Sequence, residues 1–163
     1  MRRLPRHLLA ELRLGRPGSC HLGHRGRVPH ATQNLAELRL AQGRVDEART
    51  LLDAALSDHA ALRLYDSLSY GLETAARVAW SDNRADEAAR LLGAADRLRG
   101  ESGVPIWGAR LTRFEGFAGL VRDALGDEAF AACWTEGRAL GVDGALEAAF
   151  SVVRRAESDG QRL

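Results

Sequence analysis

Apolar residues recur at helical spacing along most of the chain after residue 31. In residues 45–57 they fall at i, i+3, i+4, i+7 and i+8, as Ala48, Leu51, Leu52, Ala55 and Leu56. Residues 84–99 show a similar stripe of Ala88, Leu91, Leu92, Ala95 and Leu98. The pattern predicts an all-α fold, with helices near 32–42, 45–57, 60–82, 84–99, 108–125, 127–140 and 142–156.

A short sequence motif, here called the repeated phrase, occurs twice, forty residues apart. Windows 43–56 and 83–96 share eight of fourteen residues. Gly43 precedes the first copy and Asn83 the second, and both residue types tolerate the left-handed backbone of a tight turn. We therefore expect two helix pairs. Because one pair cannot bury its apolar face alone, the pairs should stack on each other.

Two further expectations concern helices outside the repeated phrase. Residues 60–82 read as one helix that can bend at Gly71. In residues 127–140 one face carries Phe130, Cys133, Trp134 and Gly137. We expect this face to pack on Phe114 and Phe117 and to close the C-terminal end of the stack, with Gly137 permitting close helix contact.

A composition boundary lies near residue 31. Residues 1–30 hold seven Arg, one acidic residue and three of the four Pro, without an apolar period. They are predicted to be a disordered tail or a misplaced start, ahead of a helical-repeat domain at 31–156 and a polar tail at 157–163. All 23 basic residues are Arg, which is typical of a high-GC bacterial genome.

Several function classes are disfavoured. No apolar window is long enough to span a membrane and no signal peptide is evident, so a cytoplasmic protein is expected. Cys20, His21, His24 and His30 lack a second ligand pair at zinc-like spacing, so no metal is expected. Cys133 reads as a buried hydrophobe and His59 as a surface residue. We expect neither a cofactor nor enzymatic activity.

The repeated phrase resembles the tetratricopeptide motif. After the Gly43 turn come Ala48, Leu52 and Ala55, at the intervals of the second helix of that motif. The period of 40 residues, rather than 34, and the absence of Pro after the second helix depart from it. The resemblance implies antiparallel helix pairs stacked as a short α-solenoid.

A narrower resemblance covers residues 31–150. The run from "AARLLGAADRLR" to "GDEAFAACWTEGRAL" is similar to the C-terminal repeat region of bacterial LuxR- or SARP-like ATPase transcriptional regulators. The chain has no phosphate-binding loop, since it has no Lys, and no helix-turn-helix segment is evident. The resemblance implies a non-enzymatic protein-interaction module, a fragment or remnant of such a regulator.

In tetratricopeptide stacks the first helix of each pair lines a concave groove. The matching positions, besides His30, are Gln33, Glu37, Leu40, Tyr70, Glu73, Arg77 and Trp80. They predict a short groove for a protein partner, with Trp80 alternatively covering a neighbouring helix. The other open hypothesis is a small DNA-binding regulator that uses the Arg-rich tail. Direct nucleic-acid binding is disfavoured because residues 31–163 carry a net charge of −5.

Overall fold

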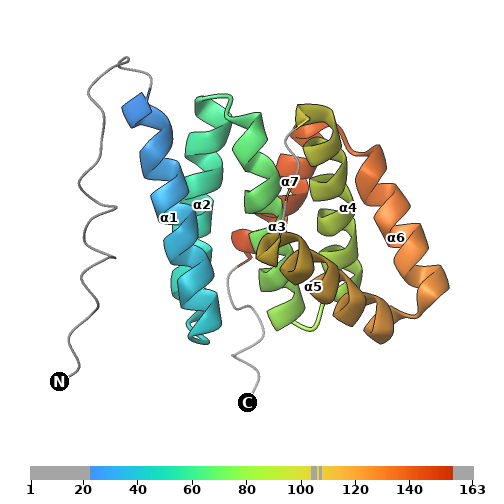
Figure 1. Cartoon of the computed structure of the whole chain (residues 1–163). Helices are drawn as coiled ribbons and strands as arrows, with labels where there is room; N and C mark the ends of the chain where they lie inside the picture. The colour runs from blue at the N-terminus through green and yellow to red at the C-terminus, as the bar shows by residue number, and fades with distance from the viewer. Residues whose placement is uncertain (1–22, 104–105, 107, 156–163) are drawn as a thin grey trace.

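The computed structural model describes residues 23–103, 106 and 108–155. Seven α-helices and no strand occur within these ranges, which confirms the predicted all-helical class (Figure 1). Their bounds are α1 Gly23–Ala41, α2 Val45–Ala61, α3 Tyr65–Ser81, α4 Ala85–Ser102, α5 Ala109–Leu125, α6 Asp127–Ala139 and α7 Val142–Val153. Of these described helices, none is both long and apolar enough to cross a membrane.

A residue with left-handed backbone follows each of the first four helices, at intervals of twenty residues. Gly43, Arg63, Asn83 and Gly103 have backbone φ angles of +74°, +53°, +59° and +65°. At the first turn the Gly43 amide donates to the Leu40 carbonyl (2.9 Å) and the Arg44 amide to that of Arg39 (2.9 Å). These two hydrogen bonds satisfy backbone carbonyls that have no partner within the last turn of the helix, and they require a residue in the left-handed conformation. The expectation for Gly43 and Asn83 is confirmed.

The turn at Arg63 corrects one prediction. Residues 60–82 do not form one helix, because α2 continues to Ala61 and α3 begins at Tyr65. The Leu64 amide donates to the His59 carbonyl (2.9 Å), as the Arg44 and Arg84 amides do to the carbonyls five residues before them. Arg63 carries the left-handed conformation there without being a typical turn residue. Helix α3 then continues without interruption through Gly71.

The start of α1 corrects another expectation. The helix begins at Gly23 rather than near residue 32, so the composition boundary at residue 31 falls inside it. Pro29 lies within α1 and its side chain is buried. The His30 Nε2 atom lies 2.9 Å from the Ser67 hydroxyl of α3. Residues 23–30 therefore belong to the helical structure, whereas the rest of the predicted tail and residues 156–163 lie outside the described ranges.

The small and large apolar residues that the repeated phrase places on one face belong to the core, together with residues of the other five helices. Ala48, Ala55, Ala88 and Ala95 are fully buried. Leucines alternate with them, and Leu52 and Leu92 are also fully buried. Small side chains at the contact let helix axes approach closely. The predicted apolar stripes of α2 and α4 are confirmed, except that Leu51 is only half-buried.

Helix α6 packs closely on α4. A Cβ atom added to Gly137 would lie 1.9 Å from the Arg90 carbonyl oxygen, and one added to Gly93 would lie 2.3 Å from that of Trp134. Gly137 therefore permits a close contact, but with α4 rather than with α5 as predicted. Of the two expected α5 partners, Phe114 contacts Trp134, with ring centroids 6.2 Å apart.

Helix α7 returns behind α2, α3 and α4 (Figure 1). Arg49 of α2 connects three elements. Its guanidinium pairs with the Asp82 carboxylate after α3, one N···O distance being 2.5 Å, and donates to the Val152 carbonyl of α7 at 2.6 Å. Arg49 is mostly shielded from water, which strengthens these charge-assisted contacts. They hold α7 against α2 and against the turn that follows α3.

His59 is buried, so the prediction of a surface position is wrong. Since α2 extends to Ala61, His59 lies within the helix, 1% exposed, with its ring centroid 5.6 Å from that of His30. Neither ring nitrogen has a hydrogen-bond partner among the described residues. Burial lowers the pKa of His59 to about 4, with a further lowering from His30 and a partial offset from Asp58.

Candidate partner groove

An open groove of about 800 Å³ lies between α1 and α5, with α3 as its floor. Figure 1 shows α3 between these two helices. The residues that line the groove are Asn34, Glu37, Leu38, Leu40 and Ala41 of α1, Glu73, Arg77, Trp80 and Ser81 of α3, and Arg110, Arg113, Gly116, Phe117 and Leu120 of α5. Three helices thus contribute to one concave surface.

The predicted groove positions divide into two groups. The five that line the groove are Glu37, Leu40, Glu73, Arg77 and Trp80. Gln33 is instead buried at 2% exposure, and Tyr70 lies half-buried under the Arg110 guanidinium, 3.5 Å from its ring centroid. His30 also lies away from the groove, on Ser67. The groove role of these residues remains a prediction, but most of them are brought together.

The wall formed by α5 was missed by the sequence analysis. Arg110, Arg113 and Leu120 lie outside the repeated phrase, so the motif gives them no groove position. The sequence signal that could have identified them is the concentration of large apolar residues on one face of α5. Phe114, Phe117 and Val121 turn inward at helical spacing, and Leu120 lies beside this buried face, next to Phe117 and exposed.

The floor of the groove holds a buried carboxylate. Glu73 pairs with Arg99 of α4, and both side chains are 10% exposed. Burial raises the pKa of Glu73, while the nearby Arg99, Arg110 and Arg77 oppose this effect. Glu37 lies beside it and accepts a hydrogen bond from the Thr74 hydroxyl (3.3 Å). Glu73 is therefore engaged in an ion pair within the protein, whereas Glu37 forms no ion pair with a described residue.

Three arginines surround these carboxylates. The Arg77 guanidinium lies 4.4 Å from the Phe117 ring centroid, Arg110 stacks on Tyr70, and Arg113 is exposed. None of the three forms an ion pair with a described residue. Ten other arginines of the described chain do: Arg39, Arg44, Arg49, Arg84, Arg90, Arg97, Arg99, Arg138, Arg154 and Arg155. The unpaired guanidiniums of α3 and α5 are concentrated in the groove.

Large apolar side chains accompany these charges. Leu38 of α1 is 50% exposed and Leu120 of α5 is 57% exposed, and both line the groove. At its floor the Trp80 ring meets the Phe117 ring edge-on, with centroids 6.1 Å apart. Trp80 thus covers its neighbouring helix and also lines the groove. Exposed leucines on both walls are typical of a surface that another apolar surface covers.

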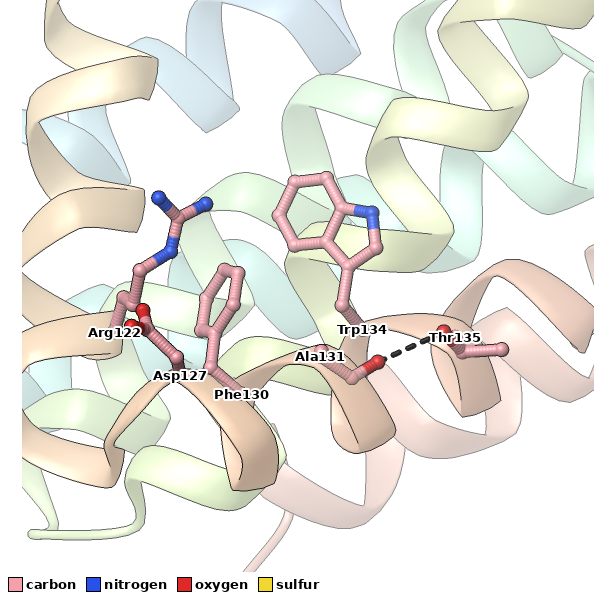
Figure 2. Close-up of a pocket in the computed structure, with 6 residues that line it drawn as sticks. All are labelled: Arg122, Asp127, Phe130, Ala131, Trp134 and Thr135. Carbon is pink, nitrogen blue, oxygen red and sulfur yellow. Dashed lines mark hydrogen bonds between the residues drawn. The ribbon is translucent and has the colours of Figure 1, made fainter.

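A second, smaller pocket of about 490 Å³ lies where α5 meets α6 (Figure 2). Its rings come from Phe130 and Trp134, whose centroids are 5.3 Å apart, and the Arg122 guanidinium lies 4.8 Å from the Phe130 centroid. The Thr135 hydroxyl donates to the Ala131 carbonyl within the same helix. Among the described residues, the charged side chains that line this pocket are Arg122 and Asp127, so it offers fewer charged groups to a partner than the groove.

The described residues contain no cluster of His, Cys, Asp or Glu that could hold a metal ion. Of the four residues weighed as a metal site, Cys20 and His21 lie outside the described ranges. Cys133 is half-buried rather than fully buried. The groove is lined by carboxylates, guanidiniums and apolar side chains, and its Ser81 hydroxyl donates to the Arg77 carbonyl of the same helix.

The chain is similar to three curated mycobacterial proteins, each named "putative HTH-type transcriptional regulator". One is from Mycobacterium bovis and two are from strains of Mycobacterium tuberculosis. Each is 34% identical over 114 residues, which is 68% of this chain and 13% of the relative. The chain therefore spans only a small part of the length of these regulators. No protein-family model matches the chain. No solved structure is significantly similar to it.

Proposed function

We propose that this chain is a non-enzymatic, protein-binding helical-repeat module of a transcriptional regulator. The chain is similar to mycobacterial transcriptional regulators. We assign it to one part of such proteins, the tetratricopeptide-like repeat region of LuxR- and SARP-type ATPase regulators. In it, α1–α2 and α3–α4 are two repeats of one stack. The recurrence of left-handed turns every twenty residues supports this arrangement.

The observation that carries the proposal is the groove between α1, α3 and α5. It has exposed leucines on two walls, and its three guanidiniums form no ion pair with a described carboxylate. A continuous surface of this kind favours a macromolecular partner over a small molecule, because its area is open and shared by three helices. Either another part of the regulator or a separate protein would satisfy it.

Photo-crosslinking in the source bacterium tests this function. Leu120 is replaced by benzoyl-phenylalanine in the full chain, and adducts are analysed by mass spectrometry after irradiation. The control carries the same group at Leu62. This residue is 37% exposed and lies at the turn between α2 and α3, outside the groove. We expect a discrete protein adduct from Leu120 and none from Leu62.

Two results would contradict the proposal. Equal adducts from both positions, or no protein adduct from either, would show that the groove is not a partner surface. Binding of the full chain to random duplex DNA at physiological salt, lost on removing residues 1–22, would favour the alternative of a DNA-binding regulator. Fluorescence anisotropy with a labelled duplex measures that binding.

A further inference from the structure

We propose that the partner of the α1–α3–α5 groove is an acidic amphipathic helix, with apolar residues along one face and carboxylates flanking them. This inference rests on the proposed function and specifies the chemistry of its partner. Two properties of the groove lead to it: the placement of its apolar side chains and the sign of its unpaired charges.

The apolar side chains fit one face of a helix. Leu38 and Leu120 stand on opposite walls, and Trp80 lies on the floor between them. An amphipathic helix presents residues at i, i+3, i+4 and i+7 as a stripe, which is the usual way in which a groove between helices is filled. Such a stripe would cover both exposed leucines at once.

The charges specify an acidic partner. Of the two carboxylates that line the groove, Glu73 pairs with Arg99, whereas Glu37 accepts a hydrogen bond from Thr74 and forms no ion pair with a described residue. The lining guanidiniums Arg77, Arg110 and Arg113 form no ion pair with a described carboxylate. Three unpaired guanidiniums therefore accompany one unpaired carboxylate, which leaves an excess of positive charge. Arg77 and Arg110 have their faces on aromatic rings, and a guanidinium stacked in this way keeps N–H donors at its edge for a carboxylate.

A basic partner is disfavoured by the same residues. A Lys or Arg entering the groove would approach Arg77, Arg110 and Arg113, and Glu37 is the one lining carboxylate outside an ion pair with a described residue. Like charges brought together in a partly desolvated groove oppose binding and exclude wrong partners. A phosphate-rich nucleic acid would satisfy the guanidiniums but would leave Leu38 and Leu120 without an apolar counterpart.

Fluorescence anisotropy with designed peptides tests the inference on the full chain. The labelled probe is a helical peptide about as long as α5, which has 17 residues, with leucines on one face and glutamates beside them. Two comparison peptides carry glutamine or lysine in place of glutamate. We expect the glutamate peptide to bind most tightly, and added salt to weaken its binding.

The matched variants are Arg113→Glu in the groove and Arg63→Glu at the turn after α2. Both arginines are exposed and form no ion pair with a described residue, so the two variants change charge equally. Arg113→Glu should raise the Kd of the glutamate peptide by about tenfold, as expected for losing one charge-assisted contact. Arg63→Glu should leave the Kd within about twofold, since Arg63 does not line the groove.

Three results would overturn the inference: no binding of the glutamate peptide, equal affinity for the glutamine or lysine peptide, or equal effects of the two variants. Competition by random duplex DNA that depends on Arg113 would assign the groove to nucleic acid instead. If the peptide fails but Leu120 still yields a discrete protein adduct, only the acidic character of the partner is wrong. Failure of both experiments would reject the proposed function as well.

Discussion

The space left by the missing side chain of Gly137 is occupied by the backbone of Arg90. The carbonyl oxygen of Arg90 lies 1.9 Å from the position that a Cβ atom would take, and on the same crossing Gly93 faces the backbone of Trp134. Backbone atoms in two packed helices cannot move aside as a flexible side chain can. The close approach of α4 and α6 therefore depends on both glycines.

Gly137→Ala should destabilise the protein by about 3 kcal/mol, because the added methyl group forces α6 away from α4. Gly100→Ala is the matched control, since it lies in α4 with open space around its Cβ position. That substitution should stabilise by about 0.5–1 kcal/mol through helix propensity. Urea unfolding measures both changes. A Gly137→Ala protein as stable as the parent would show that the helices do not cross this closely.

Arg63→Gly should stabilise the protein by about 0.5–1 kcal/mol. Arg63 has a φ angle of +53°, and a left-handed conformation costs a residue with a Cβ atom about 1–2 kcal/mol, of which glycine's larger chain entropy offsets a part. Leu62→Gly at the preceding position, where φ is −90°, should destabilise. Thermal unfolding distinguishes the two. A lower melting temperature for Arg63→Gly would contradict the shared turn geometry.

The left-handed residues that recur every twenty positions show which helix boundaries could be predicted from the sequence. Gly43, Asn83 and Gly103 are turn-forming residues, and the helices that they separate are correctly expected. Arg63 gives no such signal, so the boundary between the second and third helices was predicted at residues 58–59 rather than at residues 62–64. Pro29 and the glycines around it suggested an irregular tail, yet tertiary contacts hold Pro29 and His30 within α1.

The groove was partly predictable for a related reason. Glu37, Leu40, Glu73, Arg77 and Trp80 follow from the motif, which assigns one face of α1 and α3. The contribution of α5 could not be predicted, because α5 lies outside the repeated phrase and its position beside α3 follows only from the tertiary packing. Burial of His59 was also missed, because the length of α2 was underestimated by one turn.

Arg49→Ala should destabilise the protein by about 2–3 kcal/mol. The change leaves the half-buried Asp82 carboxylate unpaired and removes the link to the Val152 carbonyl. Arg49→Lys should recover only part of the loss, since a single ammonium cannot reproduce the planar fork. Arg154→Ala, which removes an exposed pair with Asp53, should cost no more than about 1 kcal/mol. Equal losses for Arg49→Ala and Arg154→Ala in urea unfolding would contradict this account.

His59 should make stability dependent on pH. Its folded-state pKa of about 4 lies below the ordinary value of 6.5, so the unfolded chain binds more protons between these values. Stability is therefore fully present above about pH 6.5 and falls as the pH decreases toward 4, by roughly 3 kcal/mol from this group. Subtracting the urea-unfolding curve of His59→Gln isolates the effect, because the other titrating groups are common to both proteins. A stability difference that stays constant from pH 7 to pH 4 would show that His59 does not titrate in this way.

The central claim is that α1, α3 and α5 form one surface for one protein partner. The most direct measurement compares photo-crosslinking from the two walls, with benzoyl-phenylalanine at Leu38 in one protein and at Leu120 in another. Both residues are at least half exposed, so neither substitution should disturb the fold. The account predicts that both positions capture the same segment of the same protein. Adducts with different proteins, or with only one wall, would contradict it.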